Sequence, residues 1–196
     1  KRHVPLDESA VGAVAVDGGK ALYRPGQGVE VPRSLRGIIS GRLERLGEDE
    51  RAILRLAAVV GGRFHVAMLA HVTQLPRERV GEVLEGLVGR EILVQTGAEE
   101  MGFAHGLVPE IVRSQLPLDA RRQLHAAVAE SFEAVYPDHL DELAERLAHH
   151  YREAGKRSRA IDYLVRAADR LEGEFALGGA VGMLARAIEM IGQAPS

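Results

Sequence analysis

One histidine stands where a side chain could meet an anion. His105 lies in the stretch GFAHGLVPEIV, between a short extended run and the expected first turn of a helix, which Pro109 marks. The first N–H groups of a helix have no partner within it, and the helix dipole is positive at that end, so an anion beside His105 would meet donors and positive charge. The alternative is a half-buried histidine that hydrogen-bonds locally at the end of a strand.

The other candidate groups have simpler interpretations. The segment DGGKALY contains Gly-Gly-Lys but lacks the spacing and the strand-to-helix context of a phosphate-binding loop, so we predict a turn. His149 and His150 are adjacent and would point about 100° apart on a helix, unlike an i, i+4 pair that shares a metal. His139 stands near two aspartates that fit the capped first turn of a helix. We therefore expect no catalytic residue, no metal site and no enzymatic activity in this chain.

Composition limits the classes of function. The 196 residues are 46% hydrophobic, enough for one large domain or two small ones. The absence of cysteine excludes disulfides, thiolate metal sites and cysteine nucleophiles. The net charge of -3 gives no global field that favours nucleic acid. The sequence has no apolar run of membrane-spanning length and no leader pattern, so we expect a cytoplasmic protein. Because the first residue is Lys1, we expect a fragment of a longer chain.

The first half predicts helices followed by a hairpin. In residues 1–33 two short runs, AVAV and KALY, flank Asp17-Gly18-Gly19, which predicts a small β-ribbon or a linker end. Apolar periodicity then predicts helices at about 34–46, 48–60, 65–73 and 76–91. EILVQTG and EEMGFAH alternate with a period of two and are joined at Gly97, which predicts a hairpin. Three short helices followed by a two-stranded wing is the winged-helix order.

The second half predicts helices throughout, at about 107–116, 118–135, 139–154, 157–172 and 178–192. Two of these helices match the spacing of a tetratricopeptide unit, through Ala144, Leu147, Ala148 and Tyr151 on one and Ala160, Leu164 and Ala167 on the next. A partial second unit, Ala180, Leu184 and Ala187, follows after 20 residues instead of 34. The predicted fold is therefore mainly α, with a winged-helix domain at 34–116 (three helices plus a β-hairpin wing) and antiparallel tetratricopeptide-like helical hairpins at 117–196.

A winged helix raises the question of DNA binding through its last helix. That helix carries three arginines against four glutamates: Arg77, Arg79 and Arg90, and Glu78, Glu82, Glu85 and Glu91. Each glutamate that faced a phosphate would oppose the counterion release that drives such binding. We therefore do not expect direct DNA binding, and we expect the winged helix to pack against other domains.

Three runs together resemble a known class. They begin with VPRSLRGIISGRLERLGEDERAILRLAAVVGGRFHVAMLAHVTQLPRERVGEVLEGLVGREILV, continue with FAHGLVPEIVRSQLPLDARRQLHAAVAESFE and end with LAERLAHHYREAGKRSRAIDYLVRAADR. Over about residues 30–192 the chain resembles the region that follows the nucleotide-binding core in STAND-class signal-transduction ATPases. It is especially similar to bacterial members fused to LuxR-type regulators, adenylate cyclases or protein kinases.

The resemblance implies a nucleotide-dependent switch. In related apoptotic and plant-resistance ATPases, a histidine after the winged-helix hairpin contacts the β-phosphate of bound ADP and holds the protein closed. His105 matches that position, although the residue after it is Gly106 where the family usually has aspartate. The parent protein would bind ADP or ATP with magnesium. Its phosphate loop and magnesium-binding acid would belong to an ATPase core upstream of Lys1.

Three functions remain open from the sequence. The first is a regulatory module that relays nucleotide state between the upstream ATPase core and a helical repeat array, which senses a protein or small-molecule inducer. The second is an autonomous scaffold whose helical repeats bind a protein. The third is a winged-helix transcription factor, which would need a basic surface that this sequence does not display.

Overall fold

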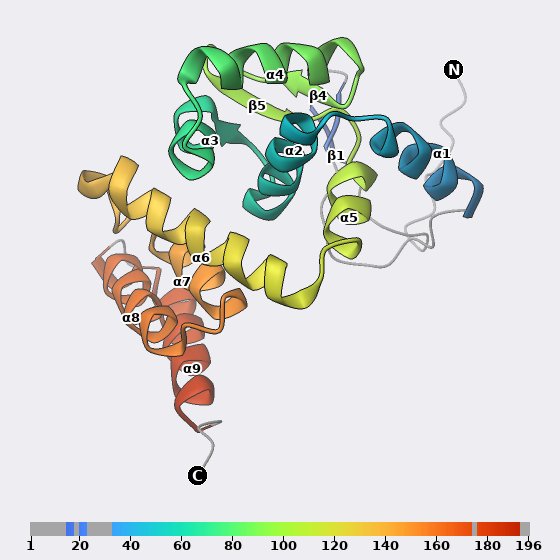
Figure 1. Cartoon of the computed structure of the whole chain (residues 1–196). Helices are drawn as coiled ribbons and strands as arrows, with labels where there is room; N and C mark the ends of the chain where they lie inside the picture. Colours follow the sequence, from blue (N-terminus) through green and yellow to red (C-terminus); the bar gives the residue numbers. More distant parts are fainter. Residues whose placement is uncertain (1–14, 18–19, 23–32, 174–175, 193–196) are drawn as a thin grey trace, which may run out of the picture. The chain divides into compact units, whose positions relative to one another are not determined.

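The computed structural model describes residues 15–17, 20–22, 33–173 and 176–192 (Figure 1). Within these residues the protein is mainly helical with little strand, as predicted, and its chain divides into two units, Lys1–Arg45 and Leu46–Ser196. None of the described helices is long and apolar enough to cross a membrane.

The first unit contains a β-hairpin and one helix. Strands β1 (Ala15–Asp17) and β2 (Lys20–Leu22) pair antiparallel, with Val16 opposite Ala21. The predicted hairpin is therefore confirmed, while its turn residues lie outside the described part. Helix α1 runs from Arg33 to Glu44, close to the expected helix at about 34–46.

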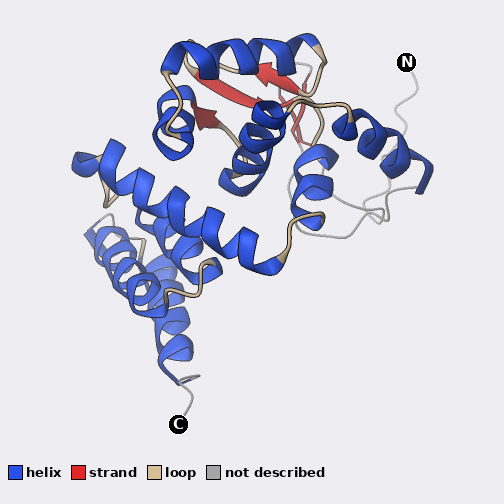
Figure 2. Ribbon diagram, in the orientation of Figure 1, coloured by secondary structure: helices blue, strands red, loops and turns tan. Residues whose placement is uncertain are grey.

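The second unit begins with three helices around a three-stranded antiparallel sheet (Figure 2). Its elements follow the order α2 (Glu48–Val60), β3 (Phe64–His65), α3 (Val66–Thr73), α4 (Arg77–Gly89), β4 (Leu93–Gln95) and β5 (Glu100–Phe103). The strand order is β3-β5-β4, so the last strand lies in the centre of the sheet. The hairpin of β4 and β5 was predicted and is confirmed, with Leu93 opposite Phe103 and Gln95 opposite Met101.

The apolar periodicity of α2 and α4 explains this arrangement. Ile53 and Ala57 on α2 and Val80 and Leu87 on α4 are fully buried, at 0% exposure, so both helices bury an apolar face. Val88, which the apolar periodicity of the fourth helix also included, is 36% exposed. Helix α2 ends where Gly61 takes a φ of 70°, a left-handed conformation that favours glycine.

Strand β3 was not predicted, and its existence depends on a distant partner. Phe64 and His65 pair with Met101 and Glu100 of β5, and the buried Phe64 ring meets Phe103 edge-on at 6.1 Å. A two-residue strand is too short to show alternation in the sequence. The helix expected from about residue 65 therefore starts at Val66, directly after the strand.

The rest of the unit is helical. Its elements are α5 (Leu107–Ser114), α6 (Leu118–Val135), the short 3₁₀ helix η1 (Pro137–His139), α7 (Ala144–Glu153), α8 (Arg157–Gly173) and α9 (Leu177–Gly192). Helix α6 packs on α2 and α3, and α6, α7, α8 and α9 then pack each on the next (Figure 1). All seven residues that matched the first tetratricopeptide unit are buried: Ala144, Leu147, Ala148, Tyr151, Ala160, Leu164 and Ala167.

The predicted start of the seventh helix is wrong. The sequence placed it at residue 139, but Pro137 begins a tight 3₁₀ turn, and a regular α-helix starts only at Ala144. The N–H of His139 donates to the carbonyl of Tyr136 at 3.1 Å, a three-residue closure that an α-helix does not use. The aspartates around His139 therefore do not cap the first turn of α7, and Asp141 forms an ion pair with Arg166 instead.

Candidate functional site

His105 lies in the loop between β5 and α5, with its side chain exposed. Its carbonyl accepts a hydrogen bond from the N–H of Val108 at 3.1 Å, which closes the first turn before α5. Among the residues that the structure describes, none forms a hydrogen bond or an ion pair with its imidazole ring. The half-buried, locally bonded histidine considered from the sequence is therefore not what the structure contains.

The loop around His105 is anchored on both sides. On the strand side, the N–H of Ala104 donates to the carbonyl of Ile92 at 3.1 Å. On the helix side, Arg113 of α5 donates through Nη1 to the carbonyl of Ala58 on α2 at 2.7 Å. The exposed imidazole is thus carried by a backbone that is fixed to the sheet and to α2.

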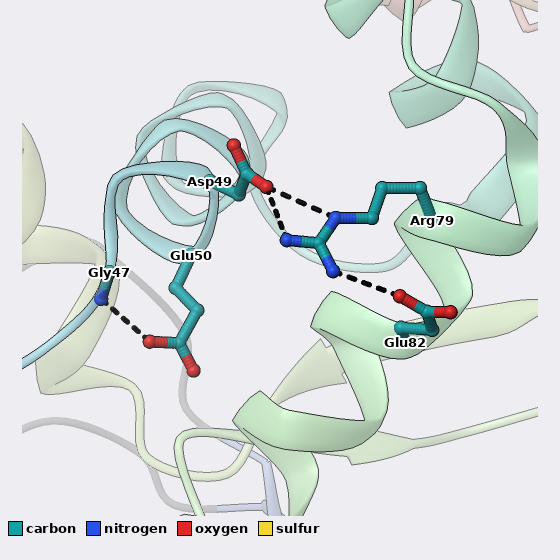
Figure 3. Close-up of polar contacts among 5 residues, drawn as sticks. All are labelled: Gly47, Asp49, Glu50, Arg79 and Glu82. Atoms are coloured by element: carbon teal, nitrogen blue, oxygen red, sulfur yellow. Dashed lines mark hydrogen bonds and ion pairs between the residues drawn. The ribbon is translucent and has the colours of Figure 1, made fainter.

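Helix α4 does not present free positive charge. Arg79 donates to Asp49 of α2 at 2.7 and 3.1 Å and to Glu82 at 2.9 Å (Figure 3). Its hydrogen bonds to Asp49 and Glu82 raise the pKa of the Arg79 guanidinium above its usual value. Arg77 pairs with Glu99 in the turn between β4 and β5, and Arg90 pairs with Glu50 at 3.3 Å.

Glu50 joins the start of α2 to the end of α4. One carboxylate oxygen accepts the N–H of Gly47 at 2.8 Å, which caps α2, while the other pairs with Arg90 (the cap is drawn in Figure 3). A Cβ on Gly86 would come within 3.4 Å of this carboxylate. All three arginines that the sequence offered for phosphate contacts are therefore engaged by carboxylates of the same unit.

A cluster of three histidines lies between α6 and α7. The Nδ1 atoms of His125 and His150 are 3.0 Å apart, and their side chains are 4% and 2% exposed. The ring of His149 lies 5.7 Å from that of His125 and 5.3 Å from that of His150. The sequence left the burial of His125 and His150 undecided, and the structure places both in the core.

Burial controls the charge of this cluster. Loss of hydration lowers the pKa of His125 from 6.5 to about 4, with Glu153 acting in the opposite direction. Burial, and then the neighbouring His125, lower the pKa of His150 to about 3. The pKa of His149 is lowered too, mainly by burial. The two buried rings, His125 and His150, are therefore neutral at pH 7.

The geometry does not make this cluster a metal centre. In the described part of the chain, no group of three or more histidine and carboxylate side chains could hold a metal ion. A groove of about 720 Å³ opens beside His149, and four arginines and three glutamates contribute to its lining. Because both signs of charge line the groove, it does not favour a ligand of either sign.

A polar network that sequence reasoning missed connects α6 with α8. Glu133 of α6 pairs with Arg159 and accepts a hydrogen bond from the hydroxyl of Tyr163. The Tyr163 ring stacks on Tyr151 of α7, with centroids 5.7 Å apart and planes 12° apart. Burial, and then the hydrogen bond to Glu133, raise the pKa of Tyr163. Because Arg159 and Tyr163 are four residues apart, the sequence could have predicted that they share one face of α8. Nothing in the sequence identifies Glu133 as the residue that they contact.

Comparison with known proteins adds no relative. No protein-family model matches this chain, and no curated protein matches it.

Proposed function

We propose that this chain is the regulatory module of a multidomain signalling ATPase of the STAND class, relaying nucleotide state between an upstream ATPase core and a helical repeat array. In this proposal residues 34–116 form a winged-helix domain and residues 117–196 form tetratricopeptide-like hairpins. The strand order β3-β5-β4 supports the winged helix, as does the position of α3 and α4 between β3 and β4 in the chain. The buried alanines of α7 and α8 support the repeat, because small residues let paired helices approach closely.

The observation that carries the proposal is the exposed imidazole of His105. His105 lies two residues after the end of β5, on an anchored loop. Its ring has no hydrogen-bond or ion-pair partner within the described residues. An exposed histidine in this position can donate to a phosphate oxygen without first breaking a contact in its own domain. Gly106 after it adds no side chain that would compete for the phosphate.

The free energy expected from a hydrogen bond between His105 and phosphate is large enough for a switch. A hydrogen bond to a charged group such as phosphate contributes roughly 1.5–3 kcal/mol. A coupling of that size changes an affinity by about 10- to 150-fold. His105 would thus favour the ADP-bound, closed state, and an inducer on the helical repeats would overcome that preference.

The engaged arginines of α4 argue against the DNA-binding alternative. Arg77, Arg79 and Arg90 each have a carboxylate partner, so binding DNA through α4 would require breaking ion pairs within the protein. The counterion release that supplies affinity for DNA is correspondingly small.

The test uses the longer chain, with the region upstream of Lys1. The protein would be purified, and its bound nucleotide identified and its release rate measured, with and without His105→Ala. We expect ADP to be retained by the native protein and to be released about 10- to 150-fold faster from the variant. His139→Ala is the matched control, since His139 is also an exposed histidine but lies on η1, outside the loop between β5 and α5. A native protein without nucleotide, or equal release from both variants, would refute the proposal.

The second candidate, a protein-binding helical scaffold, is favoured by one observation. Helix α9 exposes apolar side chains along its whole length. If nucleotide release does not depend on His105, this scaffold becomes the better description of the chain.

A further inference from the structure

A pocket of about 310 Å³ lies among the end of α2, the β3–α3 segment and helices α6 and α7. Most of its wall is apolar, with four buried side chains and two half-buried ones: Val60, Phe64, Met68, Phe132, Tyr136 and Leu143. Liquid water takes ~30 Å³ per molecule, so the pocket has room for a ligand of about ten non-hydrogen atoms. Apolar walls with a few polar groups are typical of small-molecule sites.

Aromatic rings make up much of this wall. The rings of Phe132 and Tyr136 have centroids 6.2 Å apart, and the ring of His65 meets Tyr136 edge-on at 6.4 Å. Phe64 lines the pocket from the strand side. Because aromatic rings pack favourably against one another in offset and edge-on arrangements, the wall suits an aromatic ligand.

One positive charge at the pocket is not paired. Apart from two histidines, the charged residues that line it are Arg63, Glu142 and Arg146. Arg63 approaches Glu100 of β5 at 3.4 Å, and Glu142 approaches Nδ1 of His139 at 3.3 Å. In the part of the chain that the structure describes, no carboxylate forms an ion pair with Arg146.

The guanidinium of Arg146 is held at the aromatic wall. Arg146 is an exposed residue, so a ligand can reach it, and its Cζ lies over the Phe132 ring, 4.7 Å from the centroid. Loss of hydration lowers the pKa of Arg146 from its usual value, with Tyr136 acting in the opposite direction. An anion would replace this lost hydration with charge-assisted hydrogen bonds, and the planar guanidinium matches a carboxylate through two of them.

We propose that this pocket binds a small aromatic carboxylate, whose ring packs against Phe64, Met68 and Phe132 and whose carboxylate pairs with Arg146. One unpaired arginine matches one negative charge. A cationic ligand would instead face two arginines, and a neutral one would leave Arg146 without an anion.

Such a ligand would contact residues that are distant in the chain. Phe64 and Met68 belong to β3 and α3, whereas Phe132 and Arg146 belong to α6 and α7. A ligand that binds only the folded arrangement would stabilise the packing of these elements. The inference uses no property of His105 or of nucleotide and is tested on the 196-residue chain, so it succeeds or fails independently of the proposed function.

The first test locates the ligand by means of methionine. Arg146 also borders the groove beside His149, so the two cavities must be distinguished. Of the four methionines, Met68 lines the pocket and Met190 lines the groove. Phenylacetate would be added to chain with isotope-labelled methionine methyl groups, and Met68→Leu would identify the Met68 signal. We expect that signal to shift in a saturable way, with a dissociation constant in the millimolar range or below, while the Met190 signal stays in place.

The second test varies the charge of the probe on the native protein. Phenylacetamide has nearly the same shape as phenylacetate without its charge, and phenethylamine carries a positive charge. Both should bind at least about tenfold more weakly than phenylacetate, because neither pairs with Arg146. This comparison needs no variant, so it does not depend on how a substitution affects folding.

The third test removes the arginine. Arg146→Gln should weaken phenylacetate binding at least about tenfold and abolish the preference for the acid over the amide. Arg152→Gln is the matched control, since Arg152 lies on the same helix and its loss changes the net charge equally, but it does not line the pocket. Circular dichroism would check that both variants stay helical.

Several outcomes would overturn the proposal. They are a Met68 signal that phenylacetate does not shift, a Met190 signal that shifts in its place, an amide that binds as well as the acid, and equal binding by the Arg146→Gln and Arg152→Gln variants.

Discussion

The Nδ1 atoms of His125 on α6 and His150 on α7 lie 3.0 Å apart in the core. A hydrogen bond between two imidazoles requires a proton on one of these atoms and a lone pair on the other. Two neutral rings satisfy this, while protonating both would place two buried cations in contact. The contact between α6 and α7 is therefore favoured at neutral pH and opposed in acid.

We predict that this pair makes the protein lose stability in mild acid. Burial lowers the pKa of His125 to about 4, below the 6.5 expected when the chain is unfolded. A base with a lowered pKa binds more protons in the unfolded state, so its contribution is complete above pH 6.5 and is lost as the pH falls toward 4. For His125 alone the loss is on the order of 3 kcal/mol between pH 7 and pH 4. Urea unfolding at a series of pH values would measure it.

His125→Asn separates this effect from the titration of carboxylates. The asparagine amide can occupy the place of Nδ1 without titrating, so the variant should unfold with a shallower pH dependence than the native protein. His139→Asn, which removes an exposed histidine of η1, is the control. If all three proteins show the same slope, the buried pair is not the source of the acid sensitivity.

The network at Glu133 predicts a second measurable contribution to stability. Tyr163→Phe removes the hydroxyl that donates to Glu133 and keeps the ring stacked on Tyr151. A hydrogen bond to a charged group contributes roughly 1.5–3 kcal/mol, so the free energy of unfolding should fall by about that amount. The change would be measured as a lower urea midpoint at an unchanged m-value.

Glu130 provides the comparison on the same helix. It pairs with Lys156, and its side chain is 56% exposed against 23% for Glu133. Exposed pairs contribute about 0–1 kcal/mol, so Glu130→Gln should shift the midpoint little. A Glu130→Gln variant as unstable as Tyr163→Phe would show that exposure does not decide the strength of these contacts.

Helices with strong apolar periodicity could be predicted from the sequence alone. Helices were expected at about 118–135 and 48–60, and α6 and α2 are observed with these bounds. Such helices bury one face whatever their partners are, so the pattern is local.

What could not be predicted depends on partners that are distant in sequence. Strand β3 exists because Phe64 pairs with Met101, and His125 is buried because it meets His150 from another helix. Likewise, the glutamates of α4 argued against DNA binding, but the sequence could not show that Asp49 from α2 would engage Arg79. The exposure of His105 is visible in the structure, while its role in contacting nucleotide stays a prediction.

The last prediction concerns the ion pairs of α4. Replacing the two carboxylates that hold Arg79, by Asp49→Asn with Glu82→Gln, should release its guanidinium and let α4 attract phosphate. Fluorescence anisotropy with a labelled DNA duplex at low salt should then show weak binding that native protein lacks, and this binding should weaken as salt is added.

A second double variant controls for net charge. Asp119→Asn with Glu142→Gln removes two carboxylates that are 89% and 71% exposed and that pair with Arg122 and His139, not with an arginine of α4. Each double variant changes the net charge from -3 to -1, since two negative charges are lost. If pairing with carboxylates is what keeps α4 from binding DNA, only the Asp49 and Glu82 variant should bind. Equal binding by the two variants would mean that overall charge, and not the pairing of Arg79, prevents the native chain from binding DNA.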